Sequence, residues 1–302
     1  AFKKDMMTPK EKYHLFRTNK NFCVVPWTSF EVFTDGTLKT CSVGKETLGN
    51  VNDKKLDQLL SENSKLKRIK TNMLNNIADT NCTRCHKRSI DKDGFEYYRA
   101  HYNKMLEDQD IDYHDINNFD LRSVDLHWSN ICNLRCIMCN PAQSSLIAKD
   151  EKVTVTPVNK DTIAEMTEMI VKNQYKIKEI YLSGGEPFYI PQNVELLKKI
   201  SNKDVPLRIN TNMHWNNNNK LFKILKTFNN VNLTMSVDAV NEKFNYIRSG
   251  ADWEVFKENL KYIQDNTNFT IRINSIFSVI NAIELCSTVR YFYHEQNIKD
   301  IT

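Results

Sequence analysis

The sequence predicts an α/β protein that begins with a smaller α+β region. From about residue 122 onward, β-rich runs alternate with helical runs, and repeated strand–helix units form a parallel sheet with right-handed crossovers. In the first hundred residues, an Asp-Gly dipeptide between two alternating segments predicts an antiparallel hairpin. We therefore expect a small domain at 1–105, an acidic linker at 106–121 and an α/β domain at 122–302.

The composition limits the classes of function. The 302 residues are 40% hydrophobic and 26% charged with a net charge of +5, enough chain for one large and one small domain. No stretch approaches the roughly 20 apolar residues of a membrane helix, and the first residues lack an apolar signal core. The mild charge gives no indication of nucleic-acid binding, and we expect the basic helix around Lys65–Lys70 to be a solvated face.

The cysteines favour a reducing compartment. There are eight, and seven of them stand in tight or paired motifs, which is typical of metal ligation in a cytoplasmic protein. Cys286 is the exception. It follows an apolar helical pattern, so we expect it to be a buried structural thiol.

The N-terminal region presents four of these cysteines. Strands are expected at Phe30–Phe33 and Thr37–Cys41 with the turn at Asp35-Gly36, and helices at about Leu56–Leu60 and Leu66–Leu74. The hairpin and a later Cys-x2-Cys turn supply four thiolates, which form a closed ligand shell. They are Cys23, Cys41, Cys82 and Cys85. Their spacing fits a structural zinc site or an auxiliary iron–sulfur cluster equally well.

The α/β region follows a stretch with six acidic residues against one lysine at 103–121, which is typical of a surface connection. The expected strands are Ser123–Trp128, Ile177–Leu182, Leu207–Thr211, Asn232–Val237 and Phe269–Phe277. The expected helices lie near Asp161–Lys172, Asn193–Ile200, Asn217–Phe228, Trp253–Gln264 and Ala282–His294. A sixth strand starts at Ile298–Thr302, so we expect that the chain is a fragment that stops inside the fold.

Three cysteines just after the first of these strands have the spacing Cys-x3-Cys-x2-Cys. They are Cys132, Cys136 and Cys139, the cysteine triad. Three thiolates can hold three corners of a cubane iron–sulfur cluster and leave the fourth iron open, whereas a fully ligated cluster needs four. A partial zinc site is the alternative, although zinc usually takes four ligands in paired units.

A glycine pair follows the second strand of the α/β region. The chain has seven glycines, and two of them stand side by side in Ser183-Gly184-Gly185-Glu186-Pro187. Adjacent glycines let the backbone approach a ligand closely, and Pro187 ends the strand. The segment Gly184–Pro187, the glycine loop, is therefore a candidate ligand-binding edge.

Together these motifs resemble the radical S-adenosylmethionine (radical SAM) enzymes. The resemblance implies a partial (β/α)6 barrel, a [4Fe–4S] cluster on the cysteine triad, and SAM bound at the open iron and along the glycine loop. It also implies further SAM contacts at the strand ends. These are Met138, in place of a common aromatic residue, and Asn212, Ser236, Asp238 and Arg248, the last directed at the SAM carboxylate.

The N-terminal cysteines resemble the twitch module, a shortened SPASM domain, of the same enzymes. The resemblance implies that Cys23, Cys41, Cys82 and Cys85 ligate an auxiliary [4Fe–4S] cluster. Two features depart from the usual pattern. The module precedes the triad instead of following the barrel, and the further cysteines of a full SPASM domain are missing.

The resemblance implies an oxidoreductase or modifying enzyme that cleaves SAM reductively to a 5′-deoxyadenosyl radical, which abstracts a hydrogen atom from the substrate. A peptide is the leading substrate, and a carbohydrate or nucleotide sugar is the alternative. A low-potential donor such as flavodoxin or ferredoxin is the expected partner. A non-catalytic metal-binding scaffold would explain the cysteines, but it would not need the glycine loop. The catalytic residues that touch the substrate are not identified by the sequence.

Overall fold

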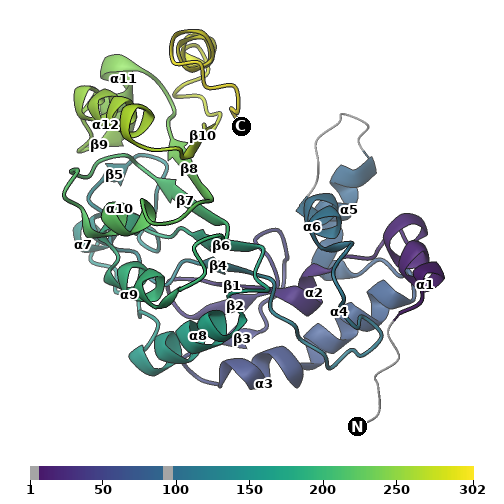
Figure 1. The fold of residues 1–302 in the computed structure, drawn as a ribbon. Helices are drawn as coiled ribbons and strands as arrows, with labels where there is room; N and C mark the ends of the chain where they lie inside the picture. The colour runs from purple at the N-terminus through teal and green to yellow at the C-terminus, as the bar shows by residue number, and fades with distance from the viewer. Residues whose placement is uncertain (1–6, 91–97) are drawn as a thin grey trace. The chain divides into compact units, whose positions relative to one another are not determined.

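The computed structural model describes residues 7–90 and 98–302, and its contacts divide the chain into two compact units. The first unit contains the described parts of 1–32, 36–124 and 159–166. The second contains 33–35, 125–158 and 167–302. Figure 1 labels the helices and strands of both units.

The first unit contains the predicted hairpin. Strand β1 (Ser29–Val32) pairs antiparallel with β2 (Thr37–Lys39), and β3 (Gly49–Asn50) extends the ribbon antiparallel to β2. Gly36 in the turn has φ +83°, a left-handed conformation that side chains rarely adopt, and an added Cβ would meet the side chain of Asn50 at 2.5 Å. The hairpin prediction is confirmed.

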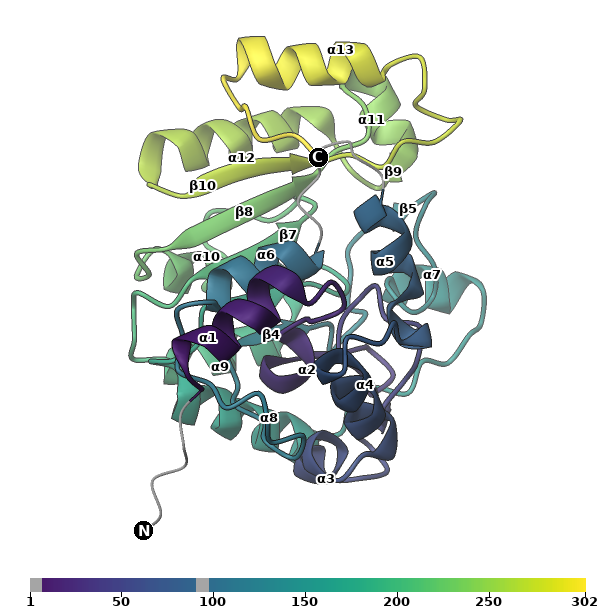
Figure 2. The same ribbon diagram turned by 90° about the vertical axis from the view of Figure 1, so that its right-hand side faces the viewer.

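Figure 2 shows the helices of the first unit, and several of them contribute buried side chains to an aromatic core. Phe22 and Trp27 both contact the fully buried ring of Tyr113, with ring centroids 5.3 and 5.8 Å apart. The predicted helices near Leu56 and Leu66 are confirmed. The helical elements are α1 (Pro9–Tyr13), η1 (His14–Thr18), α2 (Val25–Thr28), α3 (Leu56–Ser61), α4 (Ser64–Leu74), η2 (Thr80–Cys82), α5 (Thr83–Ile90) and α6 (Tyr98–Leu106).

The basic face expected on α4 is not wholly solvated. The side chain of Lys70 is fully buried, and its Nζ donates hydrogen bonds to the carbonyl oxygens of Ile116, at 3.1 Å, and Asn118, at 2.7 Å. Burial lowers the pKa of Lys70 to about 8. The expectation was wrong for this residue because Lys70 faces the core and binds the acidic connecting segment.

The second unit contains a parallel sheet, as predicted. Neighbouring strands follow the order β10-β8-β7-β6-β4, and β6, β7, β8 and β10 pair in parallel. Side chains of β7 alternate between buried and half-buried, so that Leu207, Ile209 and Thr211 face the core. The strands are β4 (Ser123–Leu126), of which Asp125 and Leu126 belong to this unit, and β6 (Glu179–Leu182), β7 (Leu207–Thr211), β8 (Val231–Ser236) and β10 (Thr270–Asn274).

Helices connect successive strands, and in Figure 1 α9, α10 and α12 lie along the same side of them. The helical elements are α7 (Ser145–Asp150), α8 (Lys160–Asn173), η3 (Pro187–Tyr189), α9 (Pro191–Lys199), α10 (Lys220–Leu225), α11 (Asn241–Ile247), α12 (Trp253–Asn266), α13 (Leu285–Arg290) and η4 (Tyr291–Glu295). The α/β class and the partial barrel are confirmed. The sequence did not predict α1, α2, α5, α6, α7 or α11, nor a two-stranded ribbon of β5 (Arg135–Cys136) and β9 (Arg248–Ser249).

At the end of the chain, the structure agrees with the predicted sixth strand but not with the predicted burial of Cys286. Ile301 forms a parallel bridge to Ile273 of β10, which agrees with the sixth strand predicted there. Cys286, however, is exposed rather than buried, and Ile283 in the same apolar pattern is 90% exposed. Over the described residues, none of the helices has the length and apolar character needed to cross a membrane.

Candidate functional site

A pocket lies where the parallel strands of the second unit end. Its lining includes both motifs found in the sequence, the cysteine triad after β4 and Gly184, Gly185 and Glu186 after β6. We call it the strand-end pocket. Because the carboxyl ends of parallel strands meet at one edge of a sheet, motifs that are 45 residues apart in the sequence come together here.

The glycine loop lies directly against the backbone that leads into the triad. Gly185 N–H donates to the carbonyl of Ser129 at 3.0 Å, and Glu186 N–H donates to that of Ile131 at 2.7 Å. A Cβ on Gly185 would lie 2.1 Å from the Ile131 oxygen. Gly184 has φ +100°, and its added Cβ would lie 2.8 Å from the Ser129 oxygen. Only glycine fits at both positions.

Glu186 fixes the far side of this loop. Its side chain is buried, and its carboxyl oxygens accept hydrogen bonds from Thr211 Oγ1 at 2.8 Å and from the Asn212 backbone N–H at 2.7 Å. Burial raises the pKa of Glu186 to about 7, against the hydrogen bonds that lower it. The Glu186 side chain therefore ties the glycine loop to the end of β7, and the backbone of the two glycines is left facing the pocket.

The three thiols of the triad differ in acidity. Burial raises the pKa of Cys132 to about 11. A hydrogen bond from the Cys136 thiol lowers the pKa of Cys139 to about 7 and raises that of Cys136. The thiolate is the form that ligates metal. Cys139 is thus the thiol of the triad whose ionisation is favoured, and all three cysteines line the same pocket.

The short ribbon brings an arginine to the triad. Cys136 on β5 pairs with Arg248 on β9, and Arg248 Nη1 lies 3.9 Å from Cys136 Sγ. The buried Arg248 guanidinium forms an ion pair with Asp238, with Nη2 and Oδ2 2.6 Å apart. Its positive charge lowers the pKa of both Cys136 and Cys139, against the larger effects described above.

The other residues predicted from the sequence are placed as follows. Met138, Asn212, Ser236, Asp238 and Arg248 all line the strand-end pocket. Pro187 is buried and starts η3, so it ends the loop without lining the pocket. Asn212 also links the loop to the triad, because its Nδ2 donates to Asn133 Oδ1 at 2.9 Å.

Some lining residues were not identified from the sequence. Tyr181, Gln143 and Ile276 line the pocket without belonging to any motif. The strand pattern could have identified Tyr181, because on β6 it alternates with the buried Ile180 and Leu182 and therefore faces the opposite side of the sheet. Gln143 lies in a loop, where periodicity gives no information. Ile276 lies beyond β10, which ends at Asn274, although the strand was predicted to continue to Phe277.

A second cavity, in the first unit, is lined by Cys23, Cys41, Cys82 and Cys85, and we call it the four-cysteine cavity. Burial raises the pKa of Cys23 well above its ordinary value, that of Cys41 to about 11 and that of Cys82 to about 12. Four thiols facing one small space fit a metal or cluster with four thiolate ligands.

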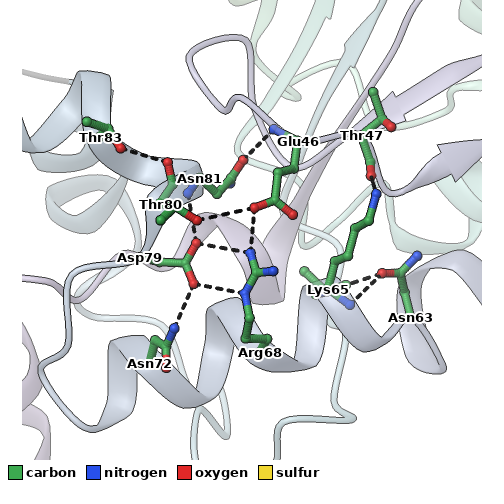
Figure 3. A network of polar contacts seen from close by, with 11 residues as sticks. Glu46, Thr47, Asn63, Lys65, Arg68, Asn72, Asp79, Thr80, Asn81 and Thr83 are labelled. Carbon is green, nitrogen blue, oxygen red and sulfur yellow. Dashed lines mark hydrogen bonds and ion pairs between the residues drawn. The ribbon is translucent and has the colours of Figure 1, made fainter.

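A polar network connects the segments that carry two of these cysteines (Figure 3). Arg68 on α4 bonds Glu46, with Nη2 and Oε1 2.7 Å apart, and Asp79, with Nε and Oδ2 3.2 Å apart. Asn81 Oδ1 accepts from the Glu46 backbone N–H at 2.8 Å. Since Cys41 precedes Glu46 and Cys82 follows Asn81, the network holds the loop after the hairpin against the turn before α5.

Two family models match the chain. The model described as the radical SAM superfamily matches residues 126–279, and the model described as an iron–sulfur cluster-binding domain, SPASM, matches residues 23–86. The first match contains the strand-end pocket from His127 to Ile276, and the second begins at Cys23 and includes Cys85.

Curated relatives are similar over part of their length. A GTP 3′,8-cyclase of Listeria welshimeri is 26% identical over 150 residues, which are 48% of this chain and 42% of that protein. An S-adenosylmethionine-dependent nucleotide dehydratase of Flammeovirga pacifica is 26% identical over 172 residues, 54% of this chain and 56% of that one. The chain thus spans about half the length of the curated relatives it matches.

Solved structures also resemble the chain. The crystal structure of SuiB from Streptococcus suis superposes with a TM-score of 0.46 at 20% identity, covering 80% of this chain and 48% of that chain.

Proposed function

The chain belongs to the radical SAM superfamily, and from this premise we propose that its strand-end pocket binds SAM at a [4Fe–4S] cluster held by Cys132, Cys136 and Cys139. The observation that carries the proposal is that these thiols and the glycine loop line one pocket. When bound, the cluster supplies one electron that splits SAM into methionine and a 5′-deoxyadenosyl radical.

The protein's own groups would then bind and orient SAM. The exposed backbone edge of Gly184 and Gly185 would accept the methionyl ammonium, because Glu186 is already engaged by Thr211 and Asn212. Arg248 would bind the methionyl carboxylate, for which a planar guanidinium is well suited. We expect Arg248 to keep Asp238 as its second partner, so that its charge stays in place before SAM arrives.

The remaining predicted contacts complete this arrangement. Met138 would pack its thioether against the adenine, and Asn212, Ser236 and Asp238 would face SAM from the ends of β7 and β8. Asn212 donates to Asn133, the residue after Cys132, so it would also fix the position of the triad relative to the glycine loop. Exclusion of water from the pocket would protect the radical.

For the four-cysteine cavity we propose an auxiliary [4Fe–4S] cluster on Cys23, Cys41, Cys82 and Cys85, in the shortened twitch form of the SPASM domain. The support is the donor set: four thiols line one cavity, and zinc with the same ligands is the alternative. The auxiliary cluster would accept an electron from the substrate or orient the substrate. Iron, sulfide and zinc analysis of protein purified without oxygen would separate the two metals.

The test of SAM chemistry is anaerobic reconstitution with iron and sulfide, followed by dithionite and SAM and an assay for 5′-deoxyadenosine. We expect Cys136→Ala to abolish SAM cleavage. Cys286→Ala is the matched control, because Cys286 is exposed and lines neither pocket. Turnover by Cys136→Ala at the rate of the Cys286→Ala control would remove the assignment of the triad.

For the substrate we propose a peptide, which the resemblance to twitch-bearing enzymes favours. The pocket supports a polar substrate, because Asn210 and Asn274 line it beside Ser236 on adjacent parallel strands. A nucleotide is the second candidate, since the two curated relatives carry the names of nucleotide-converting enzymes. Deuterium transfer into 5′-deoxyadenosine from deuterated candidates, tested with peptides encoded beside this gene and with nucleotides, would decide between them.

For the electron donor we propose a low-potential flavodoxin or ferredoxin, and for the location the cytoplasm. The cysteines support a reducing compartment, because seven of the eight stand in tight or paired motifs typical of metal ligation.

A further inference from the structure

We propose that Arg99 raises the reduction potential of the auxiliary cluster and so favours its reduced form. The inference rests on the proposed function of Cys23, Cys41, Cys82 and Cys85 as ligands of that cluster. Arg99 lies at the start of α6, outside every cysteine motif. Its proposed role is to shift the reduction potential of the cluster, not to ligate it.

The position of Arg99 is well defined. Its side chain lines the four-cysteine cavity, and its Nη1 donates a hydrogen bond to the carbonyl oxygen of Lys20. The same Nη1 lies 3.4 Å from Nδ1 of His86. Because a guanidinium has only donors, His86 Nδ1 must act as the acceptor in this contact. Contacts with two different segments therefore hold the positive charge at the wall of the cavity.

The charge of Arg99 acts on the cysteine sulfurs. It favours the thiolate of Cys82, against the much larger effect of burial. The same attraction grows when an electron is added at the cavity. A [4Fe–4S] core on four thiolates carries a net charge of −2 when oxidised and −3 when reduced, so a fixed cation stabilises the reduced form more. Net charge and hydrogen bonding are among the terms that set cluster potentials.

Among the residues that the structure describes, the other charged groups around the cavity do not reproduce this effect. Asp79 acts on Cys82 in the opposite sense, but Arg68 neutralises it in the network of Figure 3, where Nε and Oδ2 lie 3.2 Å apart. Among the described residues that line the cavity, Arg99 is the one that carries a permanent positive charge. His86, the other basic residue of the lining, is adjacent to Cys85 and accepts from Arg99.

The test is a redox titration followed by electron paramagnetic resonance. The cysteine triad is replaced by alanine in the full chain, so that one cluster remains, and dithionite supplies the single electron that converts [4Fe–4S]²⁺ to [4Fe–4S]⁺. We expect Arg99→Gln to lower the ratio of reduced to oxidised cluster at a fixed potential about tenfold, which equals a shift of about 59 mV. Arg99→Lys should leave the midpoint reduction potential close to that of the parent protein, because lysine keeps the positive charge. Lys104→Gln should leave the midpoint reduction potential unchanged, because Lys104 is exposed on the same helix and does not line the cavity.

Each outcome has one meaning. A loaded Arg99→Gln cluster with an unchanged midpoint would overturn the proposal, and so would an equal shift in Lys104→Gln, which would indicate a general surface-charge effect. Loss of the cluster in Arg99→Gln with the circular dichroism retained would also overturn it, since Arg99 would then hold the cluster in place. If the parent protein with four intact cysteines shows no cluster signal, the failure lies in the proposed auxiliary cluster itself.

Discussion

Replacing Gly185 by alanine is the most direct test of the strand-end pocket. The added Cβ would lie 2.1 Å from the Ile131 oxygen, 2.6 Å from its carbonyl carbon and 2.7 Å from that of Asn130. All three atoms belong to backbone, so no side chain can rotate away. Contacts under 3.0 Å are essentially never seen, and the two segments must therefore separate by about 0.9 Å.

The magnitude follows from the bonds that this movement breaks. Gly185 N–H to the Ser129 carbonyl and Glu186 N–H to the Ile131 carbonyl would both be lost or stretched, at about 1 kcal/mol each. Backbone displacement in a packed region costs a further 1–3 kcal/mol or so. We expect a loss of roughly 3–5 kcal/mol in the free energy of unfolding of this unit, and about 100-fold less SAM cleavage because the binding edge moves by about 1 Å.

The assay compares Gly185→Ala with Gly44→Ala. Gly44 has an ordinary backbone conformation, and the nearest atoms to its added Cβ are 3.2 and 3.3 Å away, so its neighbours need to move by only a few tenths of an ångström and we expect a loss below about 1 kcal/mol. SAM binding should be unchanged, because Gly44 lines the four-cysteine cavity and not the strand-end pocket. Both variants are reconstituted anaerobically, and SAM affinity, 5′-deoxyadenosine formation and thermal unfolding are measured. If Gly185→Ala binds SAM and unfolds like Gly44→Ala, the close approach of the glycine loop to the Ile131 backbone does not exist.

The remaining predictions concern the cysteines and Glu186. Cys82→Ala should lower the iron content yet leave uncoupled SAM cleavage measurable, and unchanged iron would contradict the auxiliary cluster. In protein without cluster, Glu186 has its pKa raised from 4.5 to about 7, so its neutral form stabilises the fold fully below pH 4.5. That stability is lost as the pH rises through 7, by up to about 3 kcal/mol. Urea unfolding of Glu186→Gln should show a correspondingly smaller decline between pH 5 and 8, and parallel pH curves for the two proteins would refute the assignment.

The sequence was informative where local periodicity or spacing carries the signal. The strand predicted at Leu207–Thr211 is β7 with the same bounds, and its Leu207, Ile209 and Thr211 are buried. The triad and the glycine loop were found because their spacing is short and their residue types are unusual. Both reach the same pocket since parallel strands end at one edge.

The sequence was uninformative where one residue depends on a distant one. The strands β5 and β9 have two residues each, which is too short for a periodic pattern of hydrophobic residues. The pairing of Cys136 with Arg248 could therefore not be predicted from the sequence. Lys70 was expected in solvent because it belongs to a basic helix. Its carbonyl partners lie 46 and 48 residues away along the chain, so they could not be recognised from the sequence. Cys286 was expected to be buried from an apolar pattern whose member Ile283 is itself exposed.

The two cysteine groups place different demands on cluster assembly. Metal binding requires thiolates, so every thiol with a raised pKa must lose a proton when the cluster enters. In the four-cysteine cavity, burial raises the pKa of Cys23, Cys41 and Cys82, and the proton release falls on buried groups. In the triad, the hydrogen bond from the Cys136 thiol lowers the pKa of Cys139 instead. In the proposed triad site, the lowered pKa of Cys139 means that this thiol would release its proton more readily than the buried thiols when a cluster binds. The four-cysteine cavity would accept its proposed cluster only as the protons of thiols with raised pKa leave, so its loading should depend more steeply on pH.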